Sequence, residues 1–363
     1  VIDMVKSPSF IEQIEAEQTY EKSPRYEKDR LYWEQIFQSR PELTSLKPSN
    51  DYCSSAKAIR LSKAVPKSLA EKLKEYSTKN HISLFNLFLS GVFLYMSKMS
   101  QKKDIVIGTM FSNRTTLREK ELFGMLVSTV PFRVEVNPAL TFSSFVRNLN
   151  QQQIRTMRHQ KYPYNRILND WRKKHSTHDY LYTTSLQYLE VDFPKTDGIR
   201  YNVDFLYNGY EINDLAFHIV KNGEDIAFEI DYRVDLFEET EIRDMFNRIM
   251  LLLSKALLAP QQQIGNLDLL TVTDQSLYFR EQMEIVCHEP EEYFQQIFQR
   301  IAKKIPEKIA VVCEERTLTY KELDERSNQL ARLLRQKGIT QEKTVAILTN
   351  RTEDMIVGSI AVM

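Results

Sequence analysis

The chain has 363 residues, of which 42% are hydrophobic, and its 49 lysines and arginines balance its 49 aspartates and glutamates. This length and apolar content suffice for two domains, or for one large domain with part of another. Because the charges cancel, no global field favours nucleic acid or an anionic membrane, and we expect neither as a partner. No apolar run reaches the roughly 20 residues that a transmembrane helix needs.

The two ends and the cysteines bear on location. The N-terminal stretch lacks the charged start, apolar run and cleavage site of a signal peptide. The three cysteines, Cys53, Cys287 and Cys313, lie far apart and suggest no disulfide framework, so they are interpreted as small hydrophobic residues. A reducing, cytoplasmic location is therefore expected. The chain starts without methionine and ends on apolar residues, which we interpret as a fragment of a longer protein.

The first part of the chain is predicted to be helical. Apolar and aromatic residues at spacings of three and four predict two helices within residues 10–37. After a polar, proline-containing stretch, Pro66 opens another helix, and the almost continuous apolar run over 83–96 predicts a buried one. A short β-branched strand is predicted over 104–111, and an amphipathic helix over 142–160.

Between these two elements, residues 121–136 predict a second strand with an unusual interior. Gly124, Ser128 and Thr129 interrupt its apolar pattern. A glycine there allows another chain or a ligand to approach closely, and the two hydroxyls would then face a cavity. The alternative is a bulge whose hydroxyls are satisfied within the protein. The residues alone leave both interpretations open.

The clearest hairpin covers residues 215–234. Apolar residues alternate along both of its strands, and Asn222-Gly223 supplies the turn. A helix over 239–258 closes this region. Farther on, a strand over 309–313, a capped helix over 320–337, a second strand over 344–348 and a final helix are typical of the start of a parallel α/β domain.

Generic catalytic patterns are missing from the sequence. It contains no glycine-rich phosphate loop, no dinucleotide fingerprint and no nucleophile elbow. His175 and His178 have no third ligand at zinc spacing, so they predict a solvated turn and no metal site. His159 opens HQKYPYNRI, where Pro163 restricts the backbone. On chemistry alone, this segment is interpreted as a structural loop in which His159 and Gln160 cap backbone groups.

Two motifs resemble those of condensation domains from nonribosomal peptide synthetases. GMLVSTVPFR is similar to the family pattern Gly-x-Phe-Val-Asn-Thr-x-x-x-Arg, with Leu126 in place of the usual Phe and Ser128 in place of Asn. The matching residues are Gly124, Val127, Thr129 and Arg133. HQKYPYN is similar to His-Gln-Asp-Tyr-Pro-Phe-Glu. Here the matching residues are His159, Gln160, Tyr162 and Pro163, and the departures are Lys161, Tyr164 and Asn165.

The end of the chain resembles the beginning of an adenylation domain. Within residues 308–338, the segment LTYKEL is similar to that family's first core motif. A condensation-like region that runs directly into an adenylation-like one has the module order of these synthetases. This order is more specific than either motif alone.

The resemblance implies a fold class and a division into domains. The fold is α/β, with a chloramphenicol-acetyltransferase-like lobe of mixed sheet and helices, followed by the beginning of a parallel α/β adenylation domain. We expect residues 1–50 to be the helical remainder of the condensation N-lobe and 51–270 to be the C-lobe. A linker over 271–290 and a truncated adenylation part over 291–363 follow.

The resemblance also implies a reaction and its partners. In this family an amine attacks a thioester, and both substrates arrive on 4′-phosphopantetheine arms through a tunnel between two lobes. The partners implied are the upstream and downstream carrier domains and the adenylation domain of the same synthetase. ATP and Mg serve the complete adenylation domain, but their site is not in this chain. The family's catalytic motif, His-His-x-x-x-Asp-Gly, is also missing, so no catalytic residue is predicted and we expect the fragment alone to be inactive.

The residues expected at the tunnel come from GMLVSTVPFR and from the downstream segment TTSLQY, which is also similar to text in that family. A tunnel needs small polar groups that orient a substrate without clashing with it. The predicted substrate-binding residues are Gly124, Ser128, Thr129, Ser185 and Gln187. The predicted structural residues are Arg133, His159, Gln160 and Pro163.

Two alternatives stay open at this point. One is an epimerisation domain of the same fold, which the adenylation-like tail argues against. The other is a non-catalytic platform that docks carrier domains and holds the adenylation domain.

Overall fold

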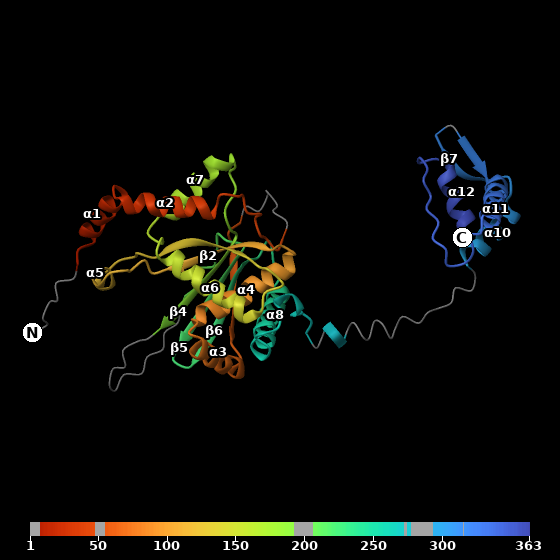
Figure 1. The fold of residues 1–363 in the computed structure, drawn as a ribbon. Coiled ribbons are helices and arrows are strands. Elements are labelled where there is room, and N and C mark those ends of the chain that lie inside the picture. Colours follow the sequence, from red (N-terminus) through yellow and green to blue (C-terminus); the bar gives the residue numbers. More distant parts are fainter. Residues whose placement is uncertain (1–7, 48–54, 192–205, 272–273, 277–292, 315) are drawn as a thin grey trace, which may run out of the picture. The chain divides into compact units, whose positions relative to one another are not determined.

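The computed structural model describes residues 8–47, 55–191, 206–271, 274–276, 293–314 and 316–363 (Figure 1). The chain divides into two compact units, residues 1–276 and 277–363, which are treated separately below. Most of the predicted linker, together with Cys53 and Cys287, lies outside the described residues. The domain boundaries expected from the sequence therefore stay predictions.

The first unit is built on a mixed six-stranded sheet with the strand order β1-β6-β5-β4-β2-β3. Its strands are β1 (Ala58–Ala64), β2 (Asp104–Phe111), β3 (Ser128–Glu135), β4 (Thr184–Val191), β5 (Leu215–Asn222) and β6 (Asp225–Arg233). β4 runs parallel to both β2 and β5, and the remaining pairs are antiparallel. The predicted hairpin is confirmed as β5–β6, where Gly223 adopts a positive φ of 58°.

One face of this sheet carries the main apolar core. Four helices cover it, namely α3 (Lys67–Asn80), α4 (Leu84–Ser100), α6 (Phe142–Met157) and α8 (Glu239–Leu258). Phe228 lies at the centre, with its ring against those of Phe88, Phe217 and Phe246. α4 is buried on every side over most of its length, as its apolar sequence predicts.

The opposite face is covered by helices at its β2–β3 end. α2 (Pro24–Ile36) and α7 (Tyr164–His175) lie there, above the sheet in the view of Figure 1. Trp33, Phe37, Tyr162 and Trp171 form a second apolar cluster with Val106 of β2. α1 (Phe10–Glu21) precedes α2, and the short α5 (Leu117–Glu121) lies between β2 and β3 in the chain.

In the first unit the structure corrects two local predictions and adds one strand. The strand expected over 121–136 begins only at Ser128, because residues 122–127 have no strand neighbour and form an irregular loop. The segment HQKYPYNRI is a loop only as far as Pro163, which is the extended N-cap residue of α7, and the helix starts at Tyr164. β1, which pairs with β6 along the sheet edge, was not predicted.

The second unit contains α10 (Phe294–Lys304), β7 (Ile309–Cys313), β8 (Arg316–Thr319), α11 (Tyr320–Gln336) and α12 (Glu353–Val362). The predicted capping box is confirmed, since Thr319 and Glu322 each bond the other's backbone N–H. The strand predicted over 344–348 is wrong. Among the described residues β7 pairs only with β8, and residues 344–348 have no strand beside them.

The described helices also bear on membrane insertion. Among them, no single helix is long and apolar enough to cross a membrane. Taken together, α3 and α4 reach the required length and composition, with a bend of 114° between them.

The central phenylalanine of the core gives a stability test. Replacing Phe228, which is fully buried, by alanine removes its contacts and leaves a cavity, so we expect a loss of about 3–5 kcal/mol in the free energy of unfolding. Urea unfolding followed by circular dichroism measures it. The same substitution at Phe123, whose side chain is 93% exposed, is the matched control and is expected to change little. Equal effects at both positions would contradict the assigned core.

Candidate functional site

A buried carboxylate joins the N-terminal helices to the rest of the first unit. Ser23 caps α2 and Pro24 occupies its first turn, which places Asp29 on the inward side of the helix, where it is only 1% exposed. Three side chains bond this carboxylate. Tyr20 Oη donates over 2.8 Å and Arg25 Nε over 3.0 Å, and His159 Nδ1 lies at 2.6 Å.

Besides its bond to Asp29, His159 has two further contacts with α2. Its ring stacks on Tyr32 with the centroids 3.9 Å apart, and its backbone carbonyl accepts from Trp33 Nε1 at 3.1 Å. The next residue, Gln160, donates from Nε2 to the carbonyl of Met157 at the end of α6. The HQKYP segment thus connects α2, α6 and α7 through hydrogen bonds and ring packing.

The arginine of the GMLVSTVPFR motif fixes the other end of α2. The Arg133 guanidinium forks onto Asp104, with Nε and Nη2 at 2.9 and 2.6 Å from its carboxylate oxygens. Its Nη1 also donates to the carbonyls of Ile36 and Ser39, at 2.8 and 2.9 Å. Arg133 therefore ties β3 to β2 and to the last turn of α2.

The buried Glu119 organises the segment before β3. Lys161 Nζ donates to its Oε1 at 2.7 Å, and the hydroxyl of Thr115 and the backbone N–H groups of Thr115 and Thr116 donate to its Oε2. Burial by itself would raise the pKa of the Glu119 carboxyl, but the hydrogen bonds from Lys161 and the threonines outweigh it and lower the pKa to about 2. Glu119 thus connects α5 to the HQKYP segment.

Arg114 then shapes the loop over residues 122–127. Its Nη1 donates to the carbonyl of Leu122 at 2.8 Å, and its Nη2 donates to that of Gly124 at 2.6 Å. Gly124 has a φ of +151°, and a Cβ at this position would lie 2.7 Å from the ring of Phe10. The positive φ favours a glycine here, and any side chain would also require the Phe10 ring to shift.

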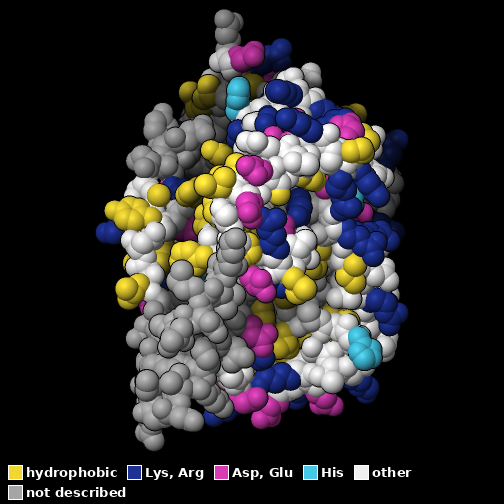
Figure 2. Space-filling view, turned by 90° about the vertical axis from the view of Figure 1, so that its left-hand side faces the viewer, with side chains coloured by type: hydrophobic (Ala, Val, Ile, Leu, Met, Phe, Trp, Pro, Cys, Tyr) yellow, Lys and Arg dark blue, Asp and Glu magenta, His cyan; other side chains and the backbone are white. Residues whose placement is uncertain are grey.

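These contacts leave a groove of about 320 Å³ between α1, the segment before β3 and the HQKYP segment. The residues that line it include Phe10, Tyr20, Asn113, Ser128, Gln160 and Pro163. The Ser128 hydroxyl donates to the Gln160 carbonyl at 3.4 Å. Beside the groove, Phe123 and Met125 are 93% and 81% exposed. Figure 2 views the molecule from the side on which α1 and α5 lie in Figure 1, and hydrophobic side chains stand exposed among charged ones there.

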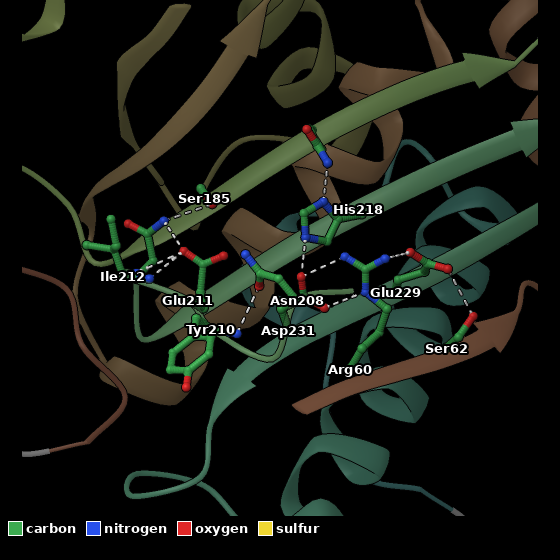
Figure 3. A network of polar contacts seen from close by, with 12 residues as sticks. Arg60, Ser62, Ser185, Asn208, Tyr210, Glu211, Ile212, His218, Glu229 and Asp231 are labelled. Atoms are coloured by element: carbon green, nitrogen blue, oxygen red, sulfur yellow. Dashed lines mark hydrogen bonds and ion pairs between the residues drawn. The ribbon is translucent and has the colours of Figure 1, made fainter. Parts of the chain in front are cut away.

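A second set of polar groups lies on the face of the sheet opposite the main core. Strand register places Thr129 opposite Met110, and Ser185 opposite Gly108 two residues away, so both hydroxyl residues share this face. Gln187 follows two residues after Ser185 and therefore lies on the same face. Asn213 Nδ2 donates to Ser185 Oγ at 3.3 Å (Figure 3).

From Gln187 the polar contacts continue across the neighbouring strands (Figure 3). Gln187 Nε2 bonds His218 Nδ1 on β5, and His218 Nε2 lies 2.8 Å from Asp231 on β6. Arg60 of β1 forks onto Asp231 with distances of 2.6 and 2.8 Å. Burial would raise the pKa of the Asp231 carboxyl, but hydrogen bonds from Arg60 and His218 outweigh it and lower the pKa. We call Gln187, His218, Asp231 and Arg60 the cross-strand chain.

The predicted site residues thus fall into two places. Ser128, Gln160 and Pro163 line the groove, and Gly124 contacts its wall. Thr129, Ser185 and Gln187 lie on the polar face of the sheet, and His159 and Arg133 hold α2. Sequence reasoning missed four buried or half-buried polar residues that connect these parts: Asp29, Arg114, Glu119 and His218. Asp29 had a detectable signal, since a lone carboxylate lies three residues after Tyr26 and four before Trp33, on their helix face.

Within the described parts of the chain, no group of three or more histidine, cysteine, aspartate or glutamate side chains is placed to hold a metal ion. Both His159 and His218 instead bond a carboxylate that other donors already share.

Two known protein families match this chain. The Condensation domain family matches residues 3–277, and the AMP-binding enzyme family matches residues 298–363. The chain belongs to the condensation-domain family. The AMP-binding match follows in the same chain and covers most of the second unit.

Individual relatives agree with this assignment. Surfactin synthase subunit 1 of Bacillus subtilis (strain 168) is 34% identical over 360 residues, and gramicidin S synthase 2 of Brevibacillus brevis is 27% identical over 354. The two alignments cover 98% and 94% of this chain, but only 10% and 8% of the relatives' own lengths. The chain is therefore similar to a small part of each synthase.

Solved structures establish the predicted fold class. A four-domain nonribosomal peptide synthetase bound to AMP and glycine superposes with a TM-score of 0.61 at 18% identity, over 86% of this chain and 25% of that one. The first condensation domain of the calcium-dependent antibiotic synthetase, in complex with a substrate analogue, gives 0.61 at 17% identity, over 75% of this chain and 60% of that one. These likenesses concern the fold.

The carboxylate of Glu119 predicts a pH-dependent contribution to stability. A pKa lowered from 4.5 to about 2 corresponds to roughly 3 kcal/mol of differential interaction. Because the folded-state pKa is depressed, this stabilisation is present above pH 4.5 and is lost as the pH falls from 4.5 toward 2. Glu119→Gln is expected to lower the free energy of unfolding at pH 7 and to flatten its decline over that window. Urea unfolding at a series of pH values measures both effects.

Glu121→Gln serves as the control, because Glu121 is exposed and lies only two residues away. This variant is expected to follow the wild-type pH dependence. A Glu119→Gln curve parallel to the wild-type curve between pH 5 and 2 would contradict the assigned ion pair.

Proposed function

We propose that this chain is part of a nonribosomal peptide synthetase module, in which its first unit contributes to peptide-bond formation between two carrier-bound thioesters. The observation that carries the proposal is the order of the two family matches on one chain, condensation before AMP-binding. An epimerisation domain of the same fold would not ordinarily run directly into an adenylation domain. A module that condenses and then activates its own amino acid accounts for the order.

The polar face of the sheet and the groove are the surfaces that would meet the substrates. Condensation brings a donor thioester and an acceptor amine together, and each arrives on a flexible 4′-phosphopantetheine arm of a carrier domain. Such an arm needs a passage with hydroxyl and amide groups that orient it. Thr129, Ser185 and Gln187 supply those groups on the sheet, and Ser128 supplies one at the groove. In this proposal the carrier domains are the principal partners.

The residues present do not fit the nucleotide chemistry of a complete adenylation domain. The sequence contains no glycine-rich phosphate loop, and the described residues include no cluster of carboxylates for a magnesium ion. No step through ATP is therefore assigned to this chain. The second unit is proposed to be the beginning of a domain whose nucleotide site is formed by other residues.

The catalytic contribution of the first unit is proposed to be positioning. No His-His-x-x-x-Asp-Gly motif occurs in the sequence, and the chain covers 60% of a solved condensation domain. We therefore propose that this chain forms one wall of the tunnel and that a further lobe carries the motif histidine. α1 and α2, with the buried Asp29–His159 contact, would be the joint between the two lobes.

This proposal predicts the outcome of a transfer assay. A donor carrier loaded with an aminoacyl group and an acceptor carrier loaded with a second one are mixed with the 363-residue chain, and the acceptor is analysed by intact mass. We expect no dipeptide above background from this chain, because it supplies one wall without the motif histidine. A longer protein that contains the whole condensation domain is expected to form the dipeptide.

The two proteins together separate the possible results. Dipeptide formation by the 363-residue chain alone would show that residues assigned here to positioning perform the chemistry. Failure of the longer protein, with its histidine motif present and both carriers loaded, would reject condensation and favour the platform that only docks carriers. Replacing the motif histidine by alanine in the longer protein is the control for non-enzymatic transfer.

A further inference from the structure

The cross-strand chain contains a histidine whose proton positions are dictated by its neighbours. His218 is 7% exposed and Asp231 is 1% exposed, so both depend on protein partners for their hydrogen bonds. Arg60 donates from two nitrogens to Asp231 and forms a further ion pair with Glu229 at 2.9 Å. The Arg60 guanidinium lies over the Tyr207 ring, with its Cζ 4.7 Å from the ring centroid. Arg60 is thus enclosed, and Asp231 beside it is held as a carboxylate.

A carboxylate only accepts hydrogen bonds, and this fixes one nitrogen of the histidine. Because His218 Nε2 faces Asp231 at 2.8 Å, Nε2 must carry a proton. In neutral His218 the other nitrogen, Nδ1, is then unprotonated and can only accept. The Gln187 side chain bonds Nδ1 and must turn its NH₂ group toward it, which directs its Oε1 away from the histidine.

Protonation of His218 would reverse this arrangement. The imidazolium has N–H groups at both nitrogens, so Nδ1 would donate and Gln187 would have to present Oε1 to it. The amide would then direct its NH₂ group away from the histidine. One proton on His218 therefore determines whether Gln187 offers an acceptor or a donor on the far side of its amide.

We propose that His218 is a positioning residue that orients the Gln187 amide, so that with neutral His218 the Gln187 Oε1 accepts a hydrogen bond from an amine or amide N–H of a bound substrate. The proposal of a ligand rests on the proposed function, in which Gln187 lies on the substrate-facing side of the sheet. The orientation itself rests only on the contacts of the cross-strand chain.

Several charged groups face His218 from the elements packed against it. Asp231 and Glu229 come from β6, with Glu229 directly opposite His218 in register, and Arg60 comes from β1. Burial, with the nearby carboxylates of Asp231 and Glu211, raises the pKa of the Tyr207 hydroxyl to about 12, so this group stays neutral. Among the described residues, these charged and titratable neighbours favour an Nε2 proton on His218 that is directed at Asp231.

The orientation is tested by NMR on the 363-residue chain. Histidines are labelled with ¹⁵N, long-range ¹H–¹⁵N spectra are recorded from pH 8.5 to 5, and a His218→Gln variant assigns the signals. At high pH we expect the Nε2–H tautomer with an unprotonated Nδ1, and at low pH the imidazolium. A neutral Nδ1–H tautomer at high pH would overturn the proposal.

Two substitutions at Gln187 sharpen this test. Gln187→Glu places an acceptor-only carboxylate at Nδ1, which favours the imidazolium, and is expected to raise the titration midpoint of His218 above that of the wild type. Gln187→Met is expected to leave the Nε2–H tautomer intact. Gln151→Glu, at an exposed position of α6, is the matched control for the added charge and is expected to leave the midpoint unchanged. An unshifted midpoint in Gln187→Glu would overturn the contact.

The ligand role is tested by kinetics in a longer protein that contains the whole condensation domain. With the acceptor carrier varied at pH 8, Gln187→Met is expected to raise KM about tenfold, with kcat affected less, because a substrate N–H loses its partner. Gln187→Glu retains an acceptor oxygen and is expected to stay within about threefold of the wild type. Equal KM values for Gln187→Met and the wild type would overturn the ligand role. An inactive wild-type protein would instead reject the proposed function, and the NMR result would still decide the orientation.

Discussion

The structure of the first unit depends on one buried carboxylate. Asp29 is bonded by Tyr20, Arg25 and His159, and these groups come from α1, α2 and the HQKYP segment. Removing any one donor would leave an acceptor buried without its full set of partners, which is far more costly than losing a surface contact. α1 would then lose its bonded connection to α2 and the HQKYP segment, although α2 would still be held by the apolar cluster around Trp33 and by Arg133. The groove between α1 and the 122–127 loop would lose one wall.

The two faces of the sheet differ in polarity. One face is almost wholly apolar and packs against α3, α4, α6 and α8. The other is apolar only under α2 and α7, and across β4, β5, β6 and β1 it carries the cross-strand chain and the hydroxyl of Ser185. Since successive side chains of a strand alternate between the two faces, the same strands supply the apolar side chains of one face and the polar side chains of the other. A rigid apolar face is what allows polar groups on the other to be held in fixed orientations.

Charged side chains also fix the segments that have no regular secondary structure. Arg114 and Glu119 hold the loop before β3, and Arg133 fixes the last turn of α2. Each uses a charged side chain to satisfy backbone groups that no strand or helix pairs. The GMLVSTVPFR and HQKYP motifs are therefore connected in space, because Ser128 of the first bonds the Gln160 carbonyl of the second.

The sequence by itself determined the elements with strong local signals and the assignment to a family. The apolar run of α4, the helix at 239–258, the strand at 104–111, the Asn222-Gly223 hairpin and the capping box at Thr319 all follow from patterns within short segments. Tertiary structure decided the rest. The 121–136 strand was shortened because residues 122–127 have no neighbour to pair with, and the strand at 344–348 did not form for the same reason. The roles of Asp29, Glu119 and His218 were likewise undetermined, because each has one partner that lies tens of residues away or more along the chain, namely His159, Lys161 and Gln187, and a buried polar group is specified by what surrounds it.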